Sequence, residues 1–425
     1  MNKVAKSERP RKSKTMGTVD ILTPEQYQPM ALDVKAELIQ ALIPLGLMHV
    51  SQVLQQEVQD LAGPRYARSP QPKALVRYGA NPSSVRLGGQ RVPIRAPRVR
   101  NQHTGQEVRL QALDALQQQP NPVDETLFKR VLYGISCRNY EAAAESIPGA
   151  IGLSASSVSR QFVHATAKRL REFQERDLSG LDLVALWLDG KSFAQDTMVI
   201  AMGLTLEGRK VPLGFVQTGT ENKSVLSAFV RQLQERGLRS DAGLLVVIDG
   251  SKGLRAAVQE VFADRALVQR CQWHKRENVV AYLPKSEQAA MRKRLQKAYG
   301  KATYAEASKA LKAILHELEQ RNASAAASLA EALEETLTLH RLGVFERLGI
   351  SLKTTNAMES VMSLVEARCG KVSCWKNSSQ KARWLAASLL DIEPRLRRVR
   401  GYRHLPELRA AIHKALGLRE AKSVA

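Results

Sequence analysis

Two aspartates stand where a carboxylate could do chemistry. Asp189 follows the apolar run at 184–188, Asp249 follows the apolar run at 244–248, and a glycine comes after each. A charge at the carboxyl end of a buried strand is costly unless it is solvated, paired or bound to a metal ion. Ligand sites in open α/β sheets also gather at that edge. The alternative for each aspartate alone is that it caps the turn that follows.

A third acid is expected from a helix that opens at Thr355 or Asn356, with Glu359 in its first turn. The spacing of Asn356 and Glu359 is also that of a capping box, and Glu366 competes for the same role two turns further along the helix. Carboxylates held close together repel one another, and a divalent cation relieves that repulsion. Mg²⁺ prefers oxygen ligands and suits phosphate chemistry. These acids therefore predict a site for two Mg²⁺ or Mn²⁺ ions.

The elements that must position the acids alternate in an α/β pattern from Gly180 onward. A strand at 184–188 precedes a hairpin that turns at Glu207-Gly208-Arg209, and a helix, a strand at 244–248, a second helix and a strand at 266–270 follow. This is the element order of an RNase H-like core, in which the first and fourth strands lie side by side. An Ala-, Leu-, Glu- and Lys-rich stretch at about 288–339 predicts an all-α insertion before the core returns.

Cys271 and His274 have the spacing of half a zinc site, which Cys369 and Cys374 could complete. The second pair is loosely spaced, so we favour a different interpretation. His274 then orients a phosphate or hydrogen-bonds within the active site, and Cys271 packs as a small apolar side chain. Both are accessory active-site residues in this interpretation.

The charge balance points to a polyanionic partner. Among 425 residues, 64 Lys and Arg outnumber 41 Asp and Glu, which gives a net charge of +23. The C-terminal part contributes a basic stretch at 365–403, where part of the charge is expected to follow phosphates. No apolar run reaches the roughly 20 residues of a membrane-spanning helix. The 4 cysteines are too few and too scattered for a disulfide framework, which predicts a reducing cytoplasm and no membrane association.

Two regions ahead of the acids have the pattern of DNA-binding elements. Residues 86–110 alternate apolar and basic side chains around Gly-Gly and Thr-Gly, which predicts a small sheet with arginines on its outer face. Residues 121–173 predict two short helices followed by a Ser-rich third helix, the pattern of a helix-turn-helix unit or of any three-helix bundle. In the helix-turn-helix interpretation Ser154 caps the third helix. The residues that face a DNA groove are then Ser156, Ser157, Ser159 and Arg160.

Four sequence blocks occur together in one order: WLDGKSF, VVIDGSKGL, QRCQWHKRENVVAYLPK and TTNAMES. In this order they resemble the signature blocks of the Mutator-type bacterial insertion-sequence transposases, and the similarity extends from about Ala80 to about Ala387. The resemblance implies that Asp189, Asp249 and Glu359 are the DDE triad of that family. It also implies that the helical segment between Asp249 and Glu359 is the inserted domain of the family.

The expected fold is an α/β RNase H-like catalytic core interrupted by an all-α insertion and preceded by helical, small β and helix-turn-helix regions. The boundaries that we predict are a disordered basic arm (1–20), an N-terminal helical region (21–78), a small basic β region (79–120), a helix-turn-helix DNA-binding domain (121–178), the first part of the core (179–285), the insertion (286–345), the core return with Glu359 (346–392) and a basic C-terminal helical tail (393–425).

The expected function is metal-dependent cleavage at transposon ends followed by strand transfer of the 3′ hydroxyl. The resemblance implies that the partners are DNA with terminal inverted repeats, target DNA, and further copies of the chain in a homodimer or higher oligomer at the bacterial nucleoid. Two alternatives compete. One is a structure-selective nuclease on the same core, which would need neither the insertion nor the helix-turn-helix unit. The other is a domesticated transposase that only binds DNA, which would gain nothing from clustered carboxylates.

Overall fold

In the computed structural model of the chain, the described residues are 43–66, 74–87, 90–118, 122–138, 154–194, 196–219 and 222–418. The predicted basic arm, the first half of the predicted N-terminal helical region and nearly all of the second predicted helix at 138–149 lie outside the described residues. The architecture is mixed α/β with two separate sheets. The chain divides into two compact units, Met1–Val123 with Arg138–Ser157, and Asp124–Cys137 with Val158–Ala425.

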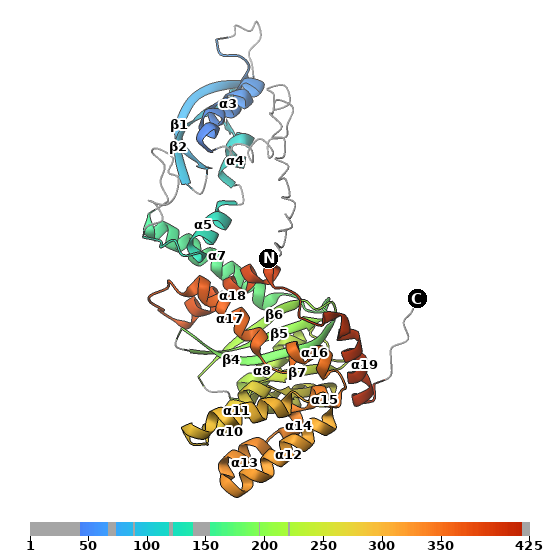
Figure 1. Ribbon diagram of the computed structural model, residues 1–425. Coiled ribbons are helices and arrows are strands. Elements are labelled where there is room, and N and C mark those ends of the chain that lie inside the picture. Colours follow the sequence, from blue (N-terminus) through green and yellow to red (C-terminus); the bar gives the residue numbers. More distant parts are fainter. Residues whose placement is uncertain are drawn as a thin grey trace, which may run out of the picture. The chain divides into compact units, whose positions relative to one another are not determined.

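The first unit is an antiparallel sheet packed against two helices (Figure 1). Its elements are α3 (Ile43–Ala62), β1 (Leu75–Leu87), β2 (Gln90–Asn101), β3 (Glu107–Val108) and α4 (Gln111–Gln118). Leu75 pairs with Asn101 at the far end of β2, so the hairpin starts within the range that we expected to be helical.

The core of the first unit forms from two matching periodicities. Val50, Leu54 and Val58 recur every four residues along α3 and meet the valines on one face of the hairpin. Arg91 and Arg95 alternate with the buried residues of β2 and are exposed. The predicted outer face of arginines is therefore present.

The second unit begins with most of α5 (Pro122–Leu132) and most of α7 (Ala155–Glu175). Phe128 of α5 stacks on Phe162 of α7 with ring centroids 6.0 Å apart, and Phe162 lies 4.9 Å from the ring of Trp384. These aromatic contacts fix α5 and α7 on the C-terminal helix that carries Trp384.

A five-stranded sheet in the order β6-β5-β4-β7-β8 is the centre of the second unit. Its strands are β4 (Leu183–Phe193), β5 (Asp196–Thr205), β6 (Lys210–Thr218), β7 (Leu244–Ile248) and β8 (Ala266–Arg270). β4, β5 and β6 are antiparallel, whereas β7 and β8 run parallel to β4. Gly208 adopts φ +85° in the turn between β5 and β6, a conformation that favours glycine. The expected element order and the neighbouring first and fourth strands are both present.

One expectation was wrong in detail, because β4 continues to Phe193 instead of ending at 188. Its last residue pairs with Asp196 of β5, so the antiparallel ladder carries the strand past Asp189. Asp189 thus lies within β4, at the point where the parallel pairing with β7 ends.

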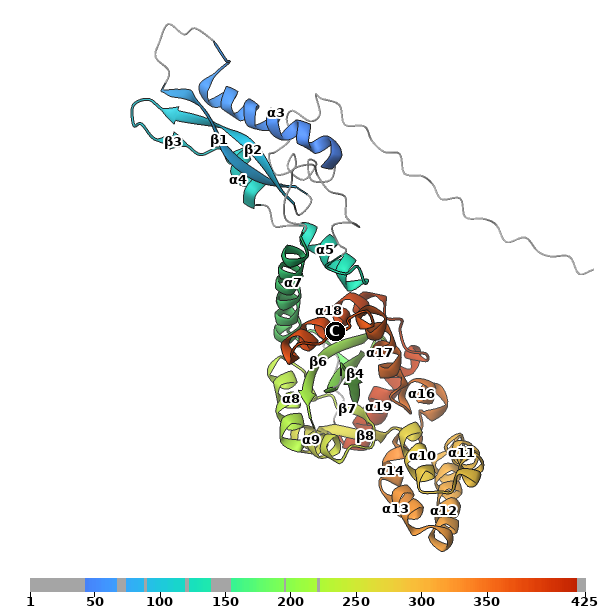
Figure 2. The ribbon, with the colours of Figure 1, turned by 90° about the vertical axis from the view of Figure 1, so that its left-hand side faces the viewer.

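Helices cover both faces of the sheet (Figure 2). On one face lie α8 (Lys223–Glu235) and α9 (Lys252–Phe262), whose leucines and phenylalanines share a buried core with the strands. The helices on the other face are α16 (Phe345–Leu352), α17 (Asn356–Cys369), α18 (Ser378–Ile392) and α19 (Leu405–Leu416). The second unit also contains short 3₁₀ turns at Ala263–Arg265 (η1), Glu393–Arg395 (η2) and Tyr402–His404 (η3).

An all-α bundle is inserted between β8 and α16, beside the β8 edge of the sheet (Figures 1 and 2). Its helices are α10 (Gln272–Ala281), α11 (Lys285–Tyr299), α12 (Tyr304–Arg321), α13 (Ala323–Ala330), α14 (Leu333–Thr336) and α15 (Thr338–Arg341). Most of them share a core of their own, which already includes Val279 and Val280 of α10. None of the helices in the described ranges is long and apolar enough to cross a membrane.

Candidate active site

The strand register brings Asp189 and Asp249 to neighbouring positions. Leu188 of β4 pairs with Ile248 of β7 in parallel register, so the two aspartates are the next residues of adjacent strands. Side chains alternate between the faces of a strand, and Trp187 belongs to the core beneath α17. Asp189, two residues on, therefore lies on the face that α17 covers.

Asp189 is a buried acid with little local compensation. Its side chain is 1% exposed, and neither of its carboxylate oxygens accepts a hydrogen bond of normal geometry. Its ion-pair partner is Lys191, whose Nζ lies 3.1 Å from Oδ2. Burial raises the pKa of Asp189 to about 7; Lys191 opposes this rise, Asp249 adds to it, and the Thr355 hydroxyl opposes it.

Glu359 reaches the same place from α17. Its Oε1 lies 3.7 Å from Nζ of Lys191, so one ammonium group contacts two of the three predicted acids. Thr355 is the N-cap residue of α17 and makes no side-chain capping hydrogen bond, so the capping box that Asn356 and Glu359 could form is absent. Glu366 is exposed on the same helix, seven residues further on. The structure thus places Glu359 beside Lys191, which is also the ion-pair partner of Asp189.

Cys271 and His274 flank the aspartates. The backbone N–H of Cys271 donates to the carbonyl of Ile248 at 2.8 Å, which puts the start of α10 next to Asp249. Burial opposes ionisation of the Cys271 thiol, but the His274 imidazole and nearby backbone N–H groups outweigh it, and the pKa of Cys271 falls. Burial likewise lowers the pKa of His274, yet Cys271 and Asp249 more than offset that effect and the pKa rises. The two side chains are therefore an electrostatic pair beside Asp249.

The buried hydroxyl of Thr355 joins this pair to Asp189. It donates to Sγ of Cys271 at 3.8 Å, and it lowers the pKa of the Asp189 carboxyl. Trp273 is 41% exposed, and its ring meets that of His274 edge-on with centroids 4.8 Å apart. An exposed aromatic face thus adjoins the acidic site.

The cysteines that could have completed a zinc site have other surroundings. Cys369 lies 3.5 Å from the hydroxyl of Ser388, and burial raises the pKa of its thiol to about 11, while Cys374 is exposed. Within the described ranges, no three His, Cys, Asp or Glu side chains form a cluster that could hold a metal ion as they stand. The three acids are included in this finding, and Lys191 lies between Asp189 and Glu359.

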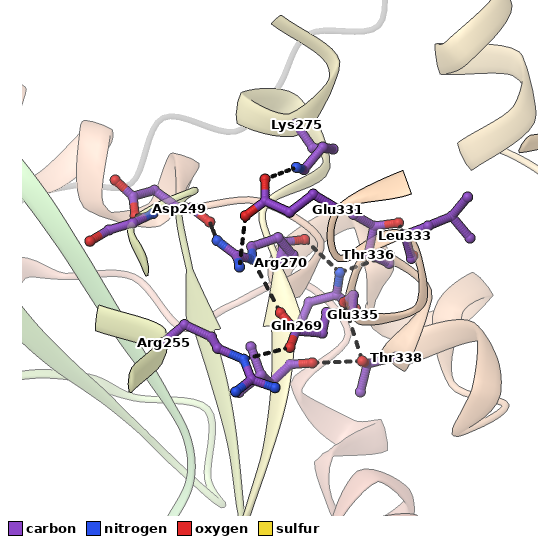
Figure 3. A network of polar contacts seen from close by, with 12 residues as sticks. Asp249, Arg255, Gln269, Arg270, Lys275, Glu331, Leu333, Glu335, Thr336 and Thr338 are labelled. Atoms are coloured by element: carbon purple, nitrogen blue, oxygen red, sulfur yellow. Dashed lines mark hydrogen bonds and ion pairs between the residues drawn. The ribbon is translucent and has the colours of Figure 1, made fainter. Parts of the chain in front are cut away.

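Arg270 contacts the backbone of Asp249 (Figure 3). It is the last residue of β8, and its side chain is only 3% exposed. Its Nη1 donates to the backbone carbonyl of Asp249 at 3.5 Å, the long end of hydrogen bonding, and its Nε donates to the Glu335 carboxylate at 3.2 Å. Arg270 thereby links Glu335 of the insertion to the backbone of Asp249.

Further polar contacts continue this network into the insertion. Nζ of the buried Lys275 donates to Glu331 at 3.0 Å and to the carbonyl of Ser328 at 2.9 Å. The buried Gln269 and Gln272 side chains each donate to the carbonyl of Thr336 at 2.9 Å. Buried polar groups that are fully paired fix one arrangement of the elements that carry them. The network therefore sets the position of α14 against the end of β8.

The residues predicted to face DNA lie on α7. The Ser154 hydroxyl accepts a hydrogen bond from the backbone N–H of Ser157 at 3.4 Å, which is the expected cap. Ser156, Ser159 and Arg160 are exposed, whereas Ser157 is half-buried. The helix that would precede α7 in a helix-turn-helix unit lies outside the described residues, so their DNA contact stays a prediction.

Part of the basic stretch at 365–403 is neutralised within the protein. Arg368 donates to Asp391 at 2.9 Å, and both side chains are buried. Nζ of Lys381 lies 2.6 Å from Asp196. Arg368 joins α17 to α18 and Lys381 joins α18 to β5, so these two cations are not available to phosphates.

Sequence reasoning missed Lys191, Thr355 and Arg270. Two of them carried a local signal, because Lys191 follows Asp189 by two residues along a strand and Thr355 precedes Glu359 by four residues at the start of a helix. Each of these spacings puts the pair on one face of its element. Arg270 had no such signal, since its partner Glu335 is 65 residues away.

These features define a class of protein, an α/β chain with carboxylates from two neighbouring strands and from a helix that follows an all-α insertion. The chain belongs to the Mutator family of transposases, whose family model matches residues 16–397.

Curated relatives include several transposases of insertion sequences. The chain is 28% identical over 396 residues to the transposase for insertion sequence element ISRM5 of Rhizobium meliloti, covering 89% of this chain and 95% of the relative. It is 29% identical over 276 residues to the transposase for IS6120 of Mycolicibacterium smegmatis, covering 63% and 83% of the two chains. The transposase for IS256 in transposon Tn4001 of Staphylococcus aureus is 24% identical over 313 residues, with 70% and 76% covered.

Proposed function

We propose that this transposase cuts and joins DNA by metal-dependent phosphoryl transfer at an RNase H-like core, with Asp189, Asp249 and Glu359 as the catalytic acids. The observation that carries the proposal is the meeting of Asp189 and Glu359 at one Lys191 ammonium, beside the strand end that bears Asp249. The strand order β6-β5-β4-β7-β8, with three antiparallel and two parallel strands, supports the assignment of the core.

The residues present fit a divalent cation of the hard, oxygen-preferring kind. Both buried carboxylate oxygens of Asp189 lack a hydrogen bond of normal geometry, and the other acid that the Lys191 ammonium contacts, Glu359, is also a carboxylate. Asp189, Asp249 and Glu359 would hold two Mg²⁺ or Mn²⁺ ions. When bound, such ions lower the pKa of a water ligand and neutralise charge on a phosphate.

The reaction proposed is hydrolysis of a phosphodiester at the transposon end, which frees a 3′ hydroxyl. That hydroxyl then attacks a phosphate of another DNA strand in line, so that a new phosphodiester forms, the attacked one breaks and its 3′ oxygen leaves as a hydroxyl, with no covalent protein intermediate. Within the described residues Nδ1 of His274 is buried and has no hydrogen-bond partner, so it can donate to a phosphate oxygen. The neighbouring Cys271 and Asp249 keep that imidazole more readily protonated.

Recognition of the transposon ends is assigned to the exposed residues at the start of α7 and to the arginine face of β2. In this proposal Ser154 caps α7, and Ser156, Ser157, Ser159 and Arg160 face the DNA groove. Terminal inverted repeats are the specific substrate, and at least two copies of the chain hold the two ends together at the bacterial nucleoid.

The test uses the purified full chain, Mg²⁺, and a duplex that carries the inverted repeat flanking its reading frame. Asp189→Ala, Asp249→Ala and Glu359→Ala should each reduce strand cleavage by about a thousandfold or more, because charge stabilisation at phosphate contributes several kcal/mol. DNA binding should persist in all three variants. Glu366→Ala is the matched control on the same helix and should cleave like the parent.

Other outcomes separate the alternatives. Cleavage without joining of the 3′ end would make the chain a nuclease. Binding without cleavage in the parent would make it a DNA-binding regulator. An active Glu359→Ala protein with an inactive Glu366→Ala protein would reassign the third acid.

A further inference from the structure

Lys191 is the cation of the acidic site in this structure. β4 continues past Asp189 in extended form, so the side chains at 189 and 191 project from one face of the strand. The Lys191 ammonium lies 3.1 Å from Asp189 and 3.7 Å from Glu359, and its side chain is 20% exposed. A lysine two residues after the first acid thus spans the gap to the third acid.

The position of this ammonium has an electrostatic reason. Asp189 is almost fully buried with Asp249 close by, and like charges at short range repel. A positive charge between the acids offsets that repulsion and draws Glu359 of α17 toward β4. The same location is where a divalent cation would have to bind if it were shared by the two carboxylates.

We infer that Lys191 is a resident cation which holds Asp189 and Glu359 together in the metal-free protein and is displaced when a divalent cation binds. This inference rests on the proposed function, since it takes the acids as the metal ligands. A divalent ion displaces the ammonium because it carries twice the charge. Its attraction to each of the two carboxylates is therefore stronger than that of the ammonium. Lys191 therefore makes metal binding weaker, and it keeps Asp189 and Glu359 together when no metal is bound.

The inference is tested by Mn²⁺ binding to the full chain, measured by calorimetry or by loss of the free Mn²⁺ signal in electron paramagnetic resonance. Lys191→Met should bind Mn²⁺ about tenfold more tightly, because a charge-assisted contact that competes with the metal is lost. Lys191→Arg keeps the charge and should bind like the parent. Lys252→Met makes the same charge change at an exposed lysine three residues after Asp249, and should change the affinity by less than about twofold.

A second measurement follows thermal unfolding in chelator. Without metal the Lys191→Met protein should unfold at a lower temperature than the parent, and excess Mn²⁺ should close that gap. A general structural role for Lys191 would leave the gap unchanged when Mn²⁺ is added. If the Met variant did not fold, Lys191→Gln provides the same comparison with a polar side chain.

Failure of the inference about Lys191 and failure of the proposed function would give different results. Equal Mn²⁺ affinity in the parent and in Lys191→Met, with binding lost in Asp189→Asn, would overturn the role of Lys191 and leave the proposed function standing. Undiminished Mn²⁺ binding by Asp189→Asn would overturn the metal assignment itself, and the inference with it.

Discussion

Arg270 and Glu335 connect the helical insertion to the edge of the sheet that bears the two aspartates. The Arg270 guanidinium donates to Glu335 at 3.2 Å and also reaches the backbone carbonyl of Asp249 (Figure 3). Arg270 is almost fully buried, so its charge is compensated by carboxylates of the insertion and not by solvent. Removing one partner of a buried ion pair leaves an uncompensated charge, which is strongly destabilising. The insertion thus contributes to the position of the second acid.

Glu335→Gln should weaken this connection and raise the Mg²⁺ concentration needed for half-maximal cleavage. We also expect it to lower the free energy of unfolding by about 2–4 kcal/mol, because Arg270 loses its main counter-charge. Glu334→Gln is the matched control, since this neighbouring carboxylate accepts from Tyr304 and lies outside the network. Equal Mg²⁺ requirements in the two variants would show that the insertion does not support Asp249.

Asp189 should make the metal-free protein less stable as the pH rises. Its folded pKa of about 7 is above the ordinary 3.8, so the folded state binds the proton more tightly than the unfolded state. The stability that protonation provides is fully present below about pH 4 and is lost as the pH rises toward 7 and above.

In chelator, the stability of the parent relative to Asp189→Asn should therefore fall by up to about 4 kcal/mol between about pH 4 and pH 8. Urea unfolding of both proteins at several pH values measures this difference. A difference that stays constant with pH would mean that Asp189 ionises normally in the folded protein.

His274 should contribute more to catalysis than to the fold. Its buried Nδ1 has no hydrogen-bond partner in the described part of the chain, so the loss of the imidazole removes no hydrogen bond at that atom. His274→Ala should slow cleavage by about a hundredfold and lower stability by only about 1 kcal/mol.

Protein purified without added metal should also contain much less than one zinc per chain. One zinc per chain that is lost in both Cys271→Ser and Cys369→Ser would instead make the motif structural.

The arginine face of β2 should bind DNA through phosphates. Arg91 and Arg95 are exposed on the strand face opposite to the core. Replacing both by Gln in the full chain should weaken duplex binding and reduce the slope of log affinity against log salt by about 2. Arg321→Gln is a control on the insertion, where the arginine pairs with Glu287 and Glu317. An unchanged salt slope in the double variant would place the DNA on another surface.

Local patterns in the sequence specify the elements and two of the three acids. Short apolar runs that end in Asp189 and Asp249 are best buried as central strands, and the periodicities between them specify the helices that cross over. Each of these signals depends on residues within one strand or one helical turn, so it can be recognised without knowing the fold. The order of elements then left few ways to arrange the strands, and the parallel pairing of β4 with β7 followed.

Which side chains meet depends instead on how whole elements pack. Glu359 and Glu366 both lie on α17, and the packing of that helix on β4 is what brings Glu359 to Lys191. β4 continues beyond its apolar run at 184–188 because it pairs with β5 as far as Phe193. Lys191 therefore lies in the strand, where its side chain reaches the acids, and not in a loop. Arg270 and Glu335 are far apart in the chain and meet because the insertion docks against β8. Such contacts arise from the summed packing of many side chains, which neighbouring residues in the sequence do not encode.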